Sequence, residues 1–118
     1  MSLTDKEKKA FVDALLPVQQ EIYFNACDKG FWRPEKAVDV PEKLCLIHSE
    51  ISEALEADRK DLMDDKLTDR IGLEVELADA CIRILDLSYA LGLDIAGAIL
   101  EKHEYNTTRA RMHGGKKY

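Results

Sequence analysis

Apolar residues recur at intervals of three and four along most of the chain, which is the period of an amphipathic α-helix. In the first such stretch the spacing links Phe11, Leu15, Val18, Ile22 and Ala26. A capping box precedes it, since Glu7 follows Thr4 by three residues, and Gly30 is suited to a left-handed helix end. The pattern therefore predicts a helix from Thr4 to Lys29.

A second helix is predicted from Val40 to Arg59. Asp39 and Glu42 form a capping box, and Pro41 lies in the first turn, where a proline is tolerated. We expect the apolar positions of this helix to face the core; they are Leu44, Ile47, Ile51 and Leu55. The residues between the first two helices, 30–38, are predicted to form a connector.

Two more helices are predicted in the second half of the chain. The charged segment 60–67 lacks a sustained apolar period and is expected to be a loop. A third helix follows over Thr68–Leu91 and is closed by Gly92, and a fourth runs from the cap residue Asp94 to Arg111. The sequence thus predicts an all-α fold, a four-helix bundle-like protomer forming one domain over residues 1–118.

The third helix has two apolar faces, which predicts an oligomer. One face carries Leu73, Leu77, Ala80, Ile84, Leu87 and Leu91, and the opposite face carries Ala78, Ile82, Leu85 and Tyr89. A helix that is apolar nearly all round is buried on both sides, and a chain of 118 residues offers little to cover the second side. We therefore expect a homodimer or a dimer of dimers, that is, a homotetramer.

Composition narrows the possible partners and compartment. The net charge is −6, so the chain has no general basic surface with which to bind nucleic acid. It has no apolar run of membrane-spanning length and no signal-peptide pattern, so no membrane association is expected. Cys27, Cys45 and Cys81 are an odd number at wide spacing, which predicts buried reduced thiols. We expect a cytoplasmic protein.

Two pairs of acidic residues are the main candidates for chemistry. Glu50 and Glu53 are three residues apart in the second predicted helix, as are Glu76 and Asp79 in the third. Residues at this spacing are neighbours on a helix surface. Each pair alone is most simply a solvated flank, but both pairs border apolar stripes on consecutive helices. Together they favour a pocket for a hard divalent cation, above all Mg²⁺, with Mn²⁺ as a substitute.

The fourth predicted helix adds cationic and amide groups. Its inward stripe comprises Ile95, Ile99, Lys102, Asn106 and Arg109, so that the stripe begins apolar and ends polar. Lys102 and Arg109 either complement the helix dipole and nearby acids or bind phosphate groups. Beside a four-carboxylate pocket, binding of a substrate's phosphates is the preferred interpretation. In the first connector, Trp32 either stacks on a nucleobase or packs the connector against the helices.

These motifs together resemble the MazG-like all-α nucleoside triphosphate pyrophosphohydrolases, a superfamily that includes dimeric dUTPases and phosphoribosyl-ATP pyrophosphohydrolases. The resemblance covers residues 44–116 and rests on Glu50-x-x-Glu53, Glu76-x-x-Asp79, and Lys102 followed by Asn106 and Arg109. Each motif is common alone, whereas the combination is fairly specific.

The resemblance implies an enzyme that cleaves a nucleoside triphosphate between the α- and β-phosphates, possible roles including removal of unwanted nucleotides from the pool. It implies Mg²⁺ held by all four acidic residues, with Glu50 or Glu53 taking the proton of the attacking water. Lys102, Asn106 and Arg109 would bind the phosphates, and Trp32 the base. The alternatives are a hydrolase of another nucleotide derivative and a non-catalytic, dimerising helical interaction module.

Overall fold

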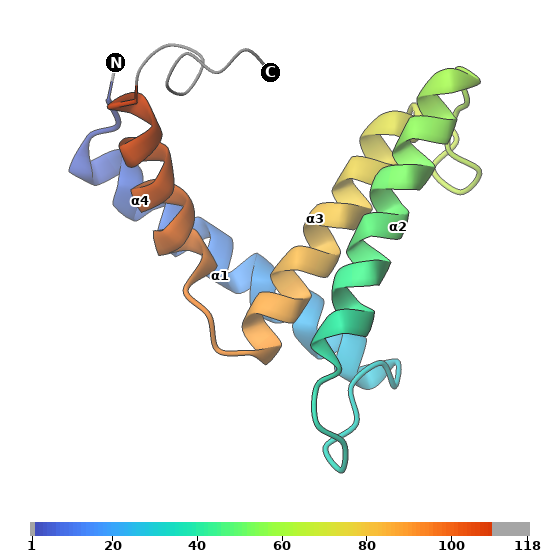
Figure 1. Cartoon of the computed structure of the whole chain (residues 1–118), viewed down its shortest axis with the longest axis horizontal. Coiled ribbons are helices and arrows are strands. Elements are labelled where there is room, and N and C mark those ends of the chain that lie inside the picture. Colours follow the sequence, from blue (N-terminus) through green and yellow to red (C-terminus); the bar gives the residue numbers. More distant parts are fainter. Residues whose placement is uncertain (1, 110–118) are drawn as a thin grey trace. The chain divides into compact units, whose positions relative to one another are not determined.

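The protein is all-helical in the computed structural model, which describes residues 2–109. Four α-helices follow one another in this range, and no strand occurs in it beyond an isolated bridge between Met63 and Ile71. They are α1 (Asp5–Asp28), α2 (Val40–Arg59), α3 (Gly72–Ala90) and α4 (Ile95–Thr107). Figure 1 shows α2 and α3 side by side, joined by the loop 60–71. The predicted all-α class is confirmed.

The chain divides into two compact units, and α1 contributes to both. One unit contains the residues up to Val18 and those from Asp94 onward, and the other is Gln19–Leu93. The second unit therefore holds the end of α1, the first connector, α2 and α3. The prediction of a single domain stays a prediction.

Three helix starts agree with the capping residues read from the sequence. Before α1, the Thr4 hydroxyl accepts from the N–H of Glu7 at 3.1 Å. In return, the Glu7 carboxylate accepts from the N–H of Thr4 at 2.9 Å. The Asp39 carboxylate accepts from the N–H of Glu42 at 3.1 Å at the start of α2. The Asp94 carboxylate accepts from the N–H of Gly97 at 3.0 Å at the start of α4. Local side-chain chemistry thus decides where these helices begin.

The third helix starts later than predicted. It begins at Gly72 rather than Thr68, because the Asp64 carboxylate accepts from the N–H groups of Lys66 and Leu67 and holds this segment in a turn. The N–H of Gly72 then donates to the carbonyl of Leu62 at 2.8 Å. Gly72 is buried against α2, where an added Cβ would lie 2.9 Å from the Ala57 Cβ.

The fourth helix ends earlier than predicted, at Thr107 instead of Arg111. The N–H of Thr108 still bonds the Tyr105 carbonyl, but Arg109 lies beyond the helix. Helical spacing therefore does not place Arg109 on one stripe with Lys102, because Arg109 lies outside α4. The remainder of the predicted helix, 110–111, lies outside the described residues.

The buried core consists mainly of small side chains, which corrects the predicted core faces. In α2 the buried residues are Glu50, Ala54 and Ala57, whereas the predicted core residues Leu44, Ile51 and Leu55 are 47%, 49% and 63% exposed. In α3 the buried residues are Gly72, Ala80, Leu87 and Ser88. Small residues let two helices approach closely, and Ala54, Ala57 and Ala80 are buried on α2 and α3 while much larger side chains remain exposed.

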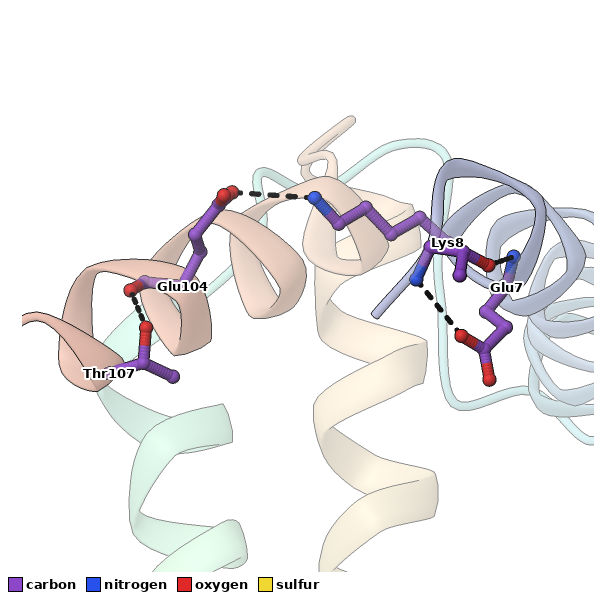
Figure 2. Close-up of polar contacts among 5 residues, drawn as sticks. Glu7, Lys8, Glu104 and Thr107 are labelled. Carbon is purple, nitrogen blue, oxygen red and sulfur yellow. Dashed lines mark hydrogen bonds and ion pairs between the residues drawn. The ribbon is translucent and has the colours of Figure 1, made fainter. Parts of the chain in front are cut away.

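The unit formed by the start of α1 and by α4 carries an ion pair between these helices. Figure 2 shows Lys8 reaching towards Glu104, with 3.5 Å between Nζ and the carboxylate. The Glu104 carboxylate is 67% exposed at the side chain, so this pair contributes at most a few tenths of a kcal/mol, roughly. The same view shows the capping box that starts α1.

The thiols are free but less buried than predicted. Cys45 and Cys81 are exposed and Cys27 is half-buried. None of the described helices is both long and apolar enough to cross a membrane.

Candidate functional site

The packing of α2 on α3 brings three of the four predicted acidic ligands together. Glu50, Glu76 and Asp79 each offer a carboxylate oxygen, and these oxygens all lie within 4.8 Å of one another. Glu53 is exposed and lies outside this group of three, which we call the acidic cluster. Its carboxyl group is nevertheless close enough to raise the pKa of Glu76.

Glu76 is the member of the acidic cluster whose negative charge is most strongly disfavoured. Burial, together with hydrogen bonding and charge from Glu50 and Glu53, raises its pKa to about 7. Its Oε2 atom is buried and has no hydrogen-bond partner among the described residues. A buried carboxylate oxygen without a donor is unusual, because the lost hydration is not replaced.

The pKa of Glu50 is shifted in the opposite direction, downward, although this residue is only 7% exposed. Burial works to raise its pKa, but the hydrogen bond from Arg83 and interactions with Glu76 and Glu53 outweigh burial and lower it. The Arg83 Nε–H donates to Glu50 Oε1 at 2.8 Å. For Asp79, burial and the charges of Glu50 and Asp64 raise the pKa, with Arg83 opposing them. Glu50 therefore holds its negative charge more readily than Glu76 does.

The side chains of the acidic cluster fit a hard divalent cation. The donor set is purely carboxylate oxygen, which suits Mg²⁺ or Mn²⁺ rather than zinc. A cation would supply the missing partner of Glu76 Oε2 and would offset the repulsion among the three groups. Glu50 can keep its hydrogen bond from Arg83 on one oxygen and offer the other, since a carboxylate accepts at both.

A cavity of about 430 Å³ adjoins the acidic cluster within the unit Gln19–Leu93. Glu50 and Asp79 form part of its wall, so two of the three members of the acidic cluster border the cavity. The rest of the lining mixes apolar and polar side chains, including Ile22, Asn25, Phe31, Trp32, Lys43 and Asp86. A pocket with apolar walls and a few convergent polar groups is typical of small-molecule sites.

Trp32 lines this cavity and is held in place from two sides. Its Nε1–H donates to Asp86 Oδ1 at 2.8 Å, and Lys43 Nζ lies 4.5 Å from the ring centroid. Tyr23 is a further neighbour, with 6.2 Å between ring centroids. Both roles considered for Trp32 are compatible with this placement, because the indole packs the connector onto α3 and also borders the cavity.

Sequence reasoning missed Arg83 and Asp86, although a signal was present. The polar residues Glu76, Asp79, Arg83 and Asp86 recur at helical spacing along α3 and form one charged stripe beside the two apolar faces. A cation one turn after the acidic pair is the feature that would have indicated a partner for Glu50. Lys43 and Asn25 had no comparable signal, since only folding brings them to this stripe.

The predicted phosphate-binding residues belong to the other compact unit. Lys102, Asn106 and Arg109 are all exposed. Lys102 Nζ lies 4.7 Å, and the Arg109 guanidinium carbon 5.8 Å, from the ring centroid of Tyr105, so the two cations share one aromatic neighbour. Their role in binding phosphate groups stays a prediction.

Comparisons with known proteins do not place the chain in a family. No protein-family model matches it, and no curated protein or solved structure is significantly similar to it.

Proposed function

We propose that this protein is a Mg²⁺-dependent nucleoside triphosphate pyrophosphohydrolase, with Mn²⁺ as a substitute metal. The observation that carries the proposal is the convergence of Glu50, Glu76 and Asp79, two of which, Glu50 and Asp79, also line a cavity. The unpartnered Glu76 Oε2 adds to it, since a cation would complete the environment of this atom. The resemblance of the acidic motifs to the MazG-like enzymes supplies the reaction, cleavage between the α- and β-phosphates.

In this proposal the residues of the acidic cluster hold the cation, which supplies charge neutralisation of the triphosphate and polarisation of its α-phosphorus. A water molecule attacks the α-phosphorus, the bond to the bridging oxygen of the β-phosphate breaks, and pyrophosphate leaves. Glu53 accepts the proton of that water, because Glu50 is committed to Arg83 and has a lowered pKa. Lys102, Asn106 and Arg109 bind the phosphates, and Trp32 borders the base.

We also propose that the protein assembles as a homodimer or homotetramer. Exposed large apolar residues occur on every described helix, among them Leu16, Phe24, Leu55, Leu77 and Ile99. No large side chain among the described residues is completely buried. Apolar surface of this extent is typical of a chain that buries it against further copies. Light scattering at micromolar concentration should give the mass of a dimer or tetramer, and a stable monomer would overturn this part of the proposal.

The enzymatic test measures pyrophosphate release from a panel of canonical and modified nucleoside triphosphates with Mg²⁺. At least one should be hydrolysed to the monophosphate. Glu53→Gln and Asp79→Asn should each reduce the rate by about 100-fold or more, the usual scale for loss of a general base or metal ligand. Glu21→Gln, at an exposed position of α1, is the matched control and should leave the rate unchanged.

The second candidate is a dimerising helical interaction module without catalysis, which the exposed apolar side chains equally favour. In that case Mg²⁺ would neither raise the melting temperature nor bind at the acidic cluster. If Mg²⁺ binds but only other nucleotide derivatives release phosphate or pyrophosphate, the protein is a related hydrolase with a different substrate. Thermal unfolding with and without Mg²⁺, followed by the panel assay, separates the three outcomes.

A further inference from the structure

The wall of the cavity beside the acidic cluster includes polar groups that the proposed hydrolysis does not use, among them the carboxylate of Asp86. Asp86 lies seven residues after Asp79 in α3, two helical turns and roughly 10 Å along the helix axis. A nucleotide whose α-phosphate lies at the acidic cluster would therefore extend its sugar and base along α3 towards Asp86 and Trp32.

The orientation of the Asp86 carboxylate is set by Trp32. Its Oδ1 accepts the indole N–H at 2.8 Å, which is the one hydrogen bond to this side chain among the described residues. The second oxygen, Oδ2, remains available to a ligand in the cavity. A carboxylate accepts hydrogen bonds and donates none when ionised, so this position can favour only ligands that present N–H or O–H groups.

We infer that Asp86 is a specificity-determining residue that selects nucleobases carrying an exocyclic amino group, namely cytosine, adenine or guanine, over uracil, thymine and hypoxanthine. The inference rests on the proposed function, because a cation held by the acidic cluster must bind the α-phosphate for the base to reach Asp86. An amino group offers an N–H to Oδ2, whereas the carbonyl that replaces it in uracil or hypoxanthine brings two acceptors together and leaves both unpaired.

The neighbouring side chains suit a base at this position. Trp32 and Phe31 offer aromatic surface to a planar ring, and Ile22 contributes an apolar wall. Lys43 lies over the Trp32 ring, 4.5 Å from its centroid, and with the indole donor partly offsets the charge of Asp86. Burial raises the pKa of Asp86, and the Trp32 hydrogen bond and the charges of Lys43 and Arg83 counteract this rise.

The test uses pairs of nucleoside monophosphates that differ in the amino group, dCMP with dUMP and dAMP with dIMP. Binding to the full-length protein is followed by the fluorescence of Trp32, the single tryptophan of the chain, and by equilibrium dialysis. In at least one pair the amino-bearing member should bind about tenfold or more tightly, as expected for a hydrogen bond to a charged acceptor.

The decisive variant is Asp86→Asn. The amide oxygen of asparagine can still accept from the Trp32 indole, while its NH₂ group turns the second position from an acceptor into a donor. The preference should therefore fall to about one or reverse towards dUMP or dIMP. Asp58→Asn, at an exposed position of α2, is the matched control and should keep the wild-type preference.

Several outcomes would overturn the inference. They are equal affinities within both pairs, an equal loss of affinity for both members in Asp86→Asn, and no binding of any of the four nucleotides. An equal loss would show that Asp86 only positions Trp32.

Pyrophosphate release without base discrimination would overturn this inference and leave the proposed function in place. Base discrimination that responds to Asp86→Asn, without pyrophosphate release from any triphosphate, would support the inference and overturn the proposed function.

Discussion

Arg83 and Glu50 join the two helices of the acidic cluster through a hydrogen bond of 2.8 Å between Nε and Oε1. The Glu50 side chain is 10% exposed and that of Arg83 is 40% exposed, so the pair lies at the edge of the α2–α3 contact. Arg83 is the cation that allows a carboxylate to remain ionised there. Its loss would leave Glu50 beside two other acids without a counter-charge.

Arg83→Met should therefore destabilise the metal-free protein by about 1–3 kcal/mol, the range for loss of the partner of a charged group that is itself buried, as Glu50 is. Urea unfolding in the presence of EDTA measures the change. Arg59→Met is the matched control, because Arg59 pairs with Glu56 at 3.7 Å with both side chains exposed, and should change stability by less than about 0.5 kcal/mol. Equal effects of the two substitutions would contradict the role given to Arg83.

Glu76→Gln should stabilise the metal-free protein at neutral pH, by about 1–2 kcal/mol. The amide removes a partly charged group from a half-buried residue whose Oε2 atom is buried, and it can donate to the carboxylates of Glu50 or Glu53. The same variant should lose most of the stabilisation that Mg²⁺ confers on the wild-type protein. Calorimetric melting with EDTA and with Mg²⁺ measures both effects. A variant that is less stable than wild type in EDTA would show that the Glu76 carboxylate is not under strain.

The stability of the metal-free protein should fall as the pH rises from about 4.5 to about 7. Glu76 has a folded-state pKa of about 7, above its usual value of 4.5, so the folded state binds more protons than the unfolded state in this window. The stabilising contribution of Glu76 is complete below pH 4.5 and is lost as the pH rises past about 7. Unfolding by urea at a series of pH values in EDTA, for wild type and Glu76→Gln, isolates this contribution. A difference between the two proteins that does not vary with pH would refute it.

Gly72→Ala should destabilise the protein by about 1–3 kcal/mol, although alanine is normally the better helix former. The added Cβ would lie 2.9 Å from the Ala57 Cβ and 3.0 Å from the Leu62 carbonyl oxygen, so α3 must shift away from α2. Adding Ala57→Gly to the variant removes one of the two contacts and should recover part of the loss. A double-mutant cycle by urea unfolding measures this coupling, and additive effects would argue against direct contact.

Sequence by itself determined the helical class and most helix ends, because these depend on local chemistry. The capping side chains of Thr4, Asp39 and Asp94 bond the N–H groups of their own first turns, and Gly30 and Gly92 adopt positive φ values of 84° and 68°. The acidic motifs were also visible, since spacing along a helix alone places two carboxylates together.

The tertiary structure decided which residues are buried and which acids meet. Ala54, Ala57 and Ala80 are buried while Leu55 stays exposed, and α2 and α3 pack so closely that a Cβ added at Gly72 would lie 2.9 Å from the Ala57 Cβ. The packing of α2 on α3 brings Glu50 close to Glu76 and Asp79, whereas Glu53 is exposed and lies outside this group. Arg83 and Asp86 acquired roles only when α3 met α2 and the Trp32 connector. Contacts between segments far apart in sequence depend on packing, which helical periodicity does not encode.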